Sequence, residues 1–119
     1  MNNIHAIKMV LMLIVICALP SVVRAGDMPV HEESPGLLKL ATIQPAAAKV
    51  SALAKVPGGS IRAAEIEKEG GKLLYSFEIK VEGRPGIEEV NVDATNGKVI
   101  GVEHEDAATE SKEAAADGG

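Results

Sequence analysis

Hydrophobic and polar residues alternate most regularly between residues 72 and 82. Every second position there carries a large apolar side chain, and the positions between them are mostly polar or charged. Side chains of a β-strand point alternately to its two faces, so this pattern predicts a central strand with one buried and one solvated face. The apolar set is Leu73, Tyr75, Phe77, Ile79 and Val81.

Three weaker strand patterns accompany this one. Residues 61–69 predict the first strand, residues 90–92 mark the third, and residues 98–103 predict the last. Glycine-rich and Asn-Gly turns separate them, because such residues readily adopt the positive φ angles of tight turns. The expected turn residues are Gly70, Gly71, Asn96 and Gly97.

A helix precedes the strands. Pro45 suits its first turn, and Ala46, Val50 and Leu53 follow at helical spacing. Pro57-Gly58-Gly59 ends it. We therefore expect an α+β fold with one helix packed on a four-stranded antiparallel meander (α-β-β-β-β) and disordered ends. The expected core consists of Leu53, Leu73, Tyr75, Phe77, Ile79, Val90, Val92 and Ile100.

The N-terminal pattern predicts export. Lys8 precedes an apolar run that ends at Pro20, and residues 1–25 resemble a signal peptide that is cut between Ala25 and Gly26. The run is shorter than the roughly 20 residues that span a bilayer, which argues against an uncleaved anchor. The mature protein is expected to be periplasmic or secreted, with no stable membrane anchor.

Composition divides the remaining chain into three parts. Residues 26–40 are expected to be a flexible linker, and residues 41–105 the folded domain. Residues 106–119 are acidic and lack large apolar side chains, so they predict a disordered tail.

Signal cleavage would also change the chemistry of the chain. It would remove Cys17, the only cysteine, so no disulfide or thiolate site is expected. Ile16, directly before it, argues against a lipid anchor at that cysteine. The formal charge of −5 becomes −7 once Lys8 and Arg24 are lost. Such a charge disfavours nucleic acid and anionic membrane as partners.

A metal site at His104 is the sharpest chemical alternative, because Glu103 and Glu105 flank it. Neighbouring residues of a strand point to opposite faces, so a solvated strand end is the preferred interpretation and no cofactor is expected.

Carboxylates gather on the predicted wet face of the sheet. They are Glu65, Glu67 and Glu69 on the first strand and Glu78 and Glu82 on the second. Lys72 and Lys80 share this face, so a solvated, charge-paired surface is expected. The alternative is a surface that meets a basic partner or a calcium ion.

An acid–base site is a further possibility. Glu88, Glu89 and Asp93 could share proton transfer, but no nucleophile or pocket-forming pattern accompanies them, and solubility charges beside turns explain them better. The sequence contains no phosphate-binding loop, no Ser/His/Asp arrangement and no HExxH pattern. No enzymatic activity is predicted.

Three segments in this order resemble the PepSY family. They are Val56-Pro57-Gly58-Gly59 after the helix, Gly71-Lys72-Leu73-Leu74-Tyr75 opening a strand, and Val92-Asp93-Ala94 running into Gly97-Lys98-Val99. The resemblance covers about residues 43–105. Asn96 stands where the family usually has Thr before the glycine, and Asn suits the same turn.

The resemblance implies a bacterial, non-enzymatic module that regulates or inhibits extracytoplasmic proteases by protein contact. Since no protease domain follows in this sequence, inhibition is expected to act on a separate protein. No binding residue is transferred from the family. The alternative function is a periplasmic divalent-cation-binding or envelope-stress protein.

Overall fold

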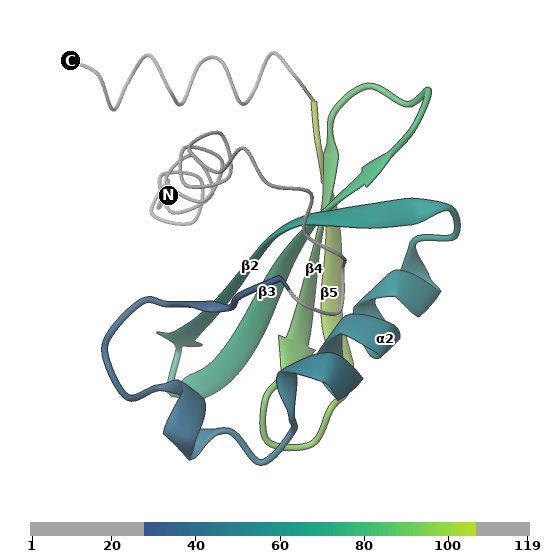
Figure 1. The fold of residues 1–119 in the computed structure, drawn as a ribbon. Helices are drawn as coiled ribbons and strands as arrows, with labels where there is room; N and C mark the ends of the chain where they lie inside the picture. The colour runs from purple at the N-terminus through teal and green to yellow at the C-terminus, as the bar shows by residue number, and fades with distance from the viewer. Residues whose placement is uncertain (1–27, 107–119) are drawn as a thin grey trace, which may run out of the picture.

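The structure of the protein, a computed structural model, describes residues 28–106 (Figure 1). The predicted signal peptide with its Ala25–Gly26 cleavage site lies outside the described residues, and so does the acidic tail from residue 107 onward. All of the predicted strands and the helix lie inside them.

One helix and five strands form two layers, with α2 lying across one face of the sheet (Figure 1). In chain order the elements are β1 (His31–Glu32), the 3-10 helix η2 (Leu38–Leu40), α2 (Pro45–Lys55), β2 (Gly59–Glu69), β3 (Lys72–Val81), β4 (Ile87–Asp93) and β5 (Val99–Glu105). The strands lie in the order β1-β2-β3-β4-β5. The four expected strands thus form an antiparallel meander.

The expectation of four antiparallel strands is corrected by β1, which makes the sheet five-stranded and mixed. This two-residue strand pairs parallel with β2, His31 opposite Glu65 and Glu32 opposite Ile66. It lies within the segment expected to be a flexible linker. The backbone N–H of Glu33 donates to the Ile66 carbonyl at 3.0 Å, and the Glu33 carboxylate accepts the Lys68 backbone N–H at 3.1 Å. These bonds hold the segment on the edge of β2.

The carboxylate of Glu32 organises the chain that follows β1. Its two oxygens accept the backbone N–H groups of Leu38 at 2.8 Å and Gly36 at 3.2 Å. These two donors hold the pKa of Glu32 below its ordinary value, the Leu38 bond contributing most. Leu37, between them, is buried in the core. The segment is therefore anchored by backbone hydrogen bonds and by burial.

Two alanines bring α2 onto the sheet. Ala48 and Ala52 are fully buried, while Val50 is 70% exposed. The helix is thus rotated away from the orientation expected from Ala46, Val50 and Leu53. Small side chains allow the helix backbone to approach the large side chains of β3 and β4 closely, and bulkier ones would push it away.

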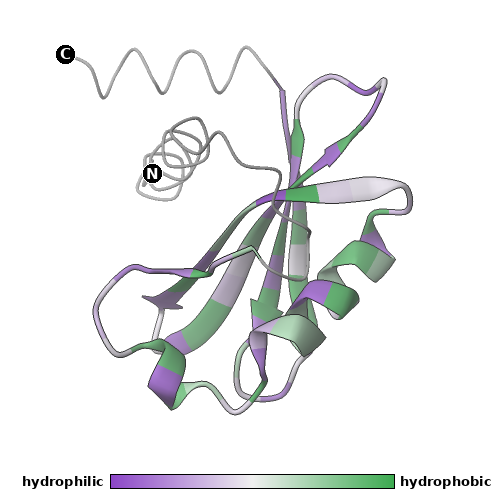
Figure 2. Cartoon of the chain, in the orientation of Figure 1, coloured by the Kyte–Doolittle hydropathy of each residue, from purple (hydrophilic) through white to green (hydrophobic). Residues whose placement is uncertain are grey.

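The core side chains of β3 and β4 lie under this helix. Tyr75, Phe77, Ile79, Val90 and Val92 are fully buried, and Leu53 and Leu73 are partly buried at the margin. The Tyr75 hydroxyl donates to the Ile43 carbonyl at 2.6 Å, and its ring stacks on Phe77 with centroids 6.0 Å apart. Figure 2 shows the resulting alternation of hydrophobic and hydrophilic bands along the strands.

Ile100, expected in the core, is instead 44% exposed. A bulge at Asn91/Val92 shifts the pairing of β4 and β5, so Val99 lies opposite Val92 and packs against the core. The extra residue of the bulge changes which side chains of β5 face inward.

The expected turn glycines adopt the conformations that the turns require. The φ angles of Gly70 and Gly71 are 55° and 80°, which suits the two-residue hairpin between β2 and β3. Gly58 and Gly97 also have positive φ angles. Gly59 is needed for space, because a Cβ there would approach Ile79 Cγ2 to 2.4 Å. Asn96 accepts the Lys98 backbone N–H through its side-chain oxygen at 2.9 Å.

Truncation of Phe77 to Ala is expected to lower the free energy of unfolding by about 3–5 kcal/mol, because it leaves a cavity in a fully buried site. Urea denaturation followed by circular dichroism measures the change. Val50→Ala, at an exposed position of α2, is the matched control and should stay within about 0.5 kcal/mol of the unsubstituted protein. Equal losses for the two variants would contradict this assignment of the core.

Candidate functional site

Carboxylates occupy the sheet face opposite α2, and we call this surface the acidic face. Because Phe77 and Val90 point into the core, their strand neighbours point to the other side of the sheet. The carboxylates placed there by strand register are Glu65, Glu67, Glu69, Glu78, Glu89, Asp93, Glu103 and Glu105.

Three glutamates form one row across the acidic face. Glu78 lies opposite Glu89 in the β3–β4 pair, and Glu89 lies opposite Glu103 in the β4–β5 pair. Like charges placed directly opposite each other on neighbouring strands repel. The row thus brings acidic side chains of β3, β4 and β5 to neighbouring positions.

Burial acts on the same carboxyl groups in a second way. Glu65, Glu67, Glu78 and Glu89 are all at most 7% exposed, so the expectation of a solvated face is wrong for these four side chains. Low exposure removes the water that would otherwise screen charge, and it disfavours the ionised form of a carboxyl group.

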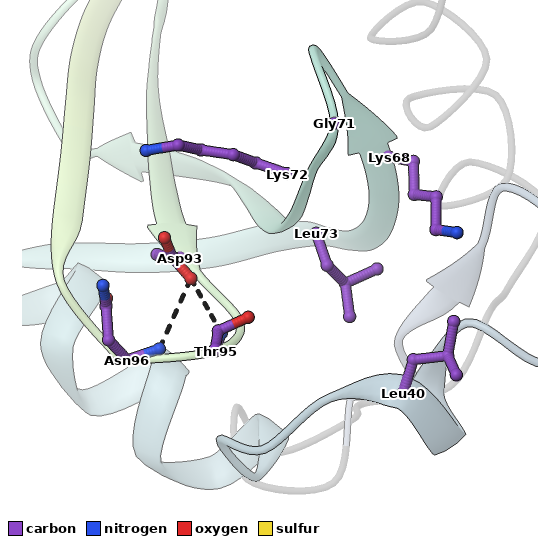
Figure 3. A pocket seen from close by; sticks show the side chains of 8 residues that line it. All are labelled: Leu40, Lys68, Gly71, Lys72, Leu73, Asp93, Thr95 and Asn96. Carbon is purple, nitrogen blue, oxygen red and sulfur yellow. Dashed lines mark hydrogen bonds between the residues drawn. The ribbon is translucent and has the colours of Figure 1, made fainter.

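The two lysines expected on this face lie in other rows of it, Lys72 directly opposite Glu69. The Nζ of Lys80 donates to the carbonyls of Arg84 and Gly86, and so secures the turn between β3 and β4. Lys72, at the hairpin end of β3, extends toward the Asp93 end of β4 (Figure 3). Neither lysine is placed at the row of Glu78, Glu89 and Glu103.

The carboxyl group of Glu89 shows the consequence most clearly. Burial raises its pKa from the ordinary 4.5 to about 7, and the nearby carboxylates of Glu105, Glu103 and Glu67 add to the rise. The Asn91 side-chain amide donates to Glu89 Oε1 at 3.3 Å and opposes the shift. Glu89 therefore changes charge near neutral pH.

Asn91 lies in the next row of the same face, opposite Ser76 and Gly101. Its Oδ1 is buried and accepts no hydrogen bond from the part of the chain that the structure describes. Gly101 on β5 has no side chain to cover this amide, and a Cβ there would lie 3.9 Å from Asn91 Nδ2. No side chain of β5 therefore lies opposite Asn91 in this row.

The structure separates the other candidate residues. The His104 Nδ1 lies 2.6 Å from Glu88 Oε1 on the adjacent strand, while Glu103 and Glu105 point to the opposite side of the sheet by alternation. Within residues 28–106, no group of three or more His, Cys, Asp or Glu side chains is arranged to hold a metal ion.

Glu88, Glu89 and Asp93 do not converge as an acid–base group. Glu88 contacts His104, whereas Glu89 belongs to the acidic face. Asp93 Oδ1 accepts the backbone N–H groups of Thr95 at 2.8 Å and Asn96 at 3.3 Å, so Asp93 organises the turn between β4 and β5.

A shallow depression of about 370 Å³ lies beside that turn (Figure 3). Its wall combines the ammonium groups of Lys68 and Lys72 with the apolar side chains of Leu40 and Leu73. The nearest carboxylate, Asp93, is occupied by the turn. The depression brings no set of groups together for catalysis.

Sequence reasoning missed the burial of Glu89 and of Lys49. The Lys49 side chain is 6% exposed, and its Nζ donates to the Met28 carbonyl at 2.6 Å. The alternation through Val90 and Val92 does place Glu89 on the outer face. Only the register between strands shows that it falls in line with Glu78 and Glu103.

One of three comparisons with known proteins finds a match. A family model described as "Peptidase propeptide and YPEB domain" (PepSY) matches residues 43–103, slightly more than half of the chain. The resemblance predicted from the sequence is thereby confirmed. No curated protein and no solved structure matches the chain. No helix among residues 28–106 is both long and apolar enough to cross a membrane.

Replacement of Glu89 by Gln is expected to stabilise the protein by up to about 3 kcal/mol at pH 8, and by little at pH 4.5. Since the folded-state pKa is raised to about 7, the folded protein holds a proton that the unfolded chain releases between pH 4.5 and 7. Stability of the unsubstituted protein therefore falls as pH rises through this window, and the Gln variant escapes that loss.

Urea denaturation across this pH range measures the difference between the variants. Glu82→Gln is the matched control because Glu82 is exposed, and it should leave the pH profile unchanged. Parallel profiles for Glu89→Gln and the unsubstituted protein would show that Glu89 does not carry this linkage.

Proposed function

Because the chain belongs to the PepSY family, we propose that it is an exported, non-enzymatic module that regulates proteases outside the cytoplasm by protein contact. The family match carries the proposal, since the family's description joins this domain to peptidase propeptides. The match extends over α2, β2, β3, β4 and β5 as far as Glu103, which together supply most of the core.

Two features of the molecule support binding by contact. The row of Glu78 and Glu89 ends at the exposed Glu103 on β5, and negative charge on a surface steers partners of opposite charge. The sheet also ends in β5, a strand whose outer side can pair with another chain. Both features recognise a protein surface without covalent chemistry.

Export is part of the proposal. The predicted signal sequence would carry the protein to the periplasm or the medium, where secreted proteases act. A net charge of −5 for the whole chain favours basic protein surfaces over nucleic acids or anionic lipids.

Purified protein is expected to slow hydrolysis of a fluorogenic peptide by at least one extracytoplasmic metalloprotease of the source organism, in proportion to the inhibitor added. The protein itself should stay intact on a gel, which separates inhibition from substrate competition. Phe77→Ala, expected to unfold the domain, should lose the effect. Unchanged hydrolysis across the whole panel of proteases would refute protease regulation.

A further inference from the structure

The outer edge of β5 carries a combination of groups that the proposed function leaves unused. β5 is the last strand of the sheet, and Ile100 and Val102 on it are 44% and 47% exposed. Glu103, next in sequence, is also exposed and continues the row of Glu78 and Glu89. Apolar and anionic side chains thus meet at one strand edge.

Backbone geometry shows which groups of β5 point outward. The Asp93 N–H donates to the Lys98 carbonyl at 2.8 Å, so alternate residues of β4, including Glu89, turn their backbone groups toward β5. Glu103 lies opposite Glu89, so the backbone N–H and C=O groups of Glu103 point toward β4. The N–H and C=O groups of Val102 and His104 therefore point away from the sheet, where an added strand could pair with them.

The opposite edge of the sheet, formed by β2, is partly covered by β1. β1 covers the middle of β2, and Glu33 bonds both to the Ile66 carbonyl and to the Lys68 N–H. Arg62, at a bulge, interrupts the β2 edge further along, and charged residues and bulges protect edges from pairing. β5 is the more accessible edge of the described sheet.

Side chains of a strand added beside β5 would alternate between the two faces of the sheet. On the face that α2 covers, an apolar side chain of the added strand would pack against Val102. On the other side, a cationic residue would meet Glu103, and a long one could pass over Gly101 toward Asn91 Oδ1 and Glu89. The buried Oδ1 of Asn91 lacks a donor from the described residues, and a lysine or arginine supplies one.

We propose that the β5 edge binds an extended segment of a partner protein in which apolar and cationic side chains alternate. This inference rests on the proposed function, because it names the surface and the kind of segment through which the module acts. The exposed carboxylate of Glu103 makes the edge selective, since a cationic strand would pair with it and an acidic strand would be repelled.

A second copy of this chain is a poor occupant of the edge. Pairing β5 with another β5 would bring the Glu103 and Glu105 side chains of both copies to one seam. Each copy also carries a net charge of −5. Repulsion between these charges opposes association.

The test uses capped synthetic peptides of about six residues, the usual length of a strand, labelled for fluorescence polarisation. One alternates Val with Lys and the other alternates Val with Glu. We expect the purified full chain to bind the Val–Lys peptide at least about tenfold more tightly than the Val–Glu peptide. Raised salt should weaken binding of the Val–Lys peptide.

Val102→Pro removes one outward N–H without removing a donor from the β4–β5 ladder. It should weaken Val–Lys binding by about tenfold or more, whereas Val102→Ala, which keeps that N–H, should lose less than about threefold. Glu103→Lys should reverse the preference between the two peptides. If circular dichroism shows that Val102→Pro does not fold, the Glu103→Lys variant tests the inference instead, and an unchanged peptide preference in that variant would refute it.

Three outcomes would overturn the inference. They are equal binding of the two peptides, full binding by a folded Val102→Pro variant, and a dimer in light scattering that Val102→Pro dissolves. Protease inhibition that survives Val102→Pro would refute binding at the β5 edge but not the proposed protease regulation. Selective peptide binding without any inhibition would refute protease regulation but not binding at the β5 edge.

Discussion

The close packing of α2 on the sheet is the interaction on which the rest of the structure depends. It requires Ala48 and Ala52 at the contact and the full burial of Tyr75 and Phe77 beneath them. The bond from the Tyr75 hydroxyl to the Ile43 carbonyl fixes where the chain enters the helix. Because a one-residue slip would turn these rings to the other face, the packing also fixes the register of β3.

The same register lowers stability on the sheet face opposite α2. The same alignment that buries Phe77 and Val90 places Glu78, Glu89 and Glu103 in one row. The burial of Glu78 and Glu89 on neighbouring strands opposes folding, and hydrophobic contacts elsewhere offset it. Departures from local stability rules concentrate where a protein does its work, so the acidic face and β5 are where we look for the binding surface of the proposed module.

The meander could be predicted from sequence because its signals are local. Alternation from Leu73 to Val81 and the Gly70-Gly71 hairpin each report on neighbouring residues. β1 could not be predicted, because a two-residue strand has no period and its partner in β2 is distant along the chain. The bulge that exposes Ile100 likewise depends on pairing between strands. The burial of Glu89 depends on three strands together, so the candidate site was the least predictable part.

The hydrogen bond from Lys49 to the Met28 carbonyl bears on where the folded unit begins. Family similarity starts at Ile43, yet Met28, Val30 and Leu37 already pack on the core. A recombinant fragment trimmed to the span of similarity would lose β1 and one acceptor for a buried ammonium group. The family match thus marks what relatives share, whereas the core of this chain also uses side chains that precede the match.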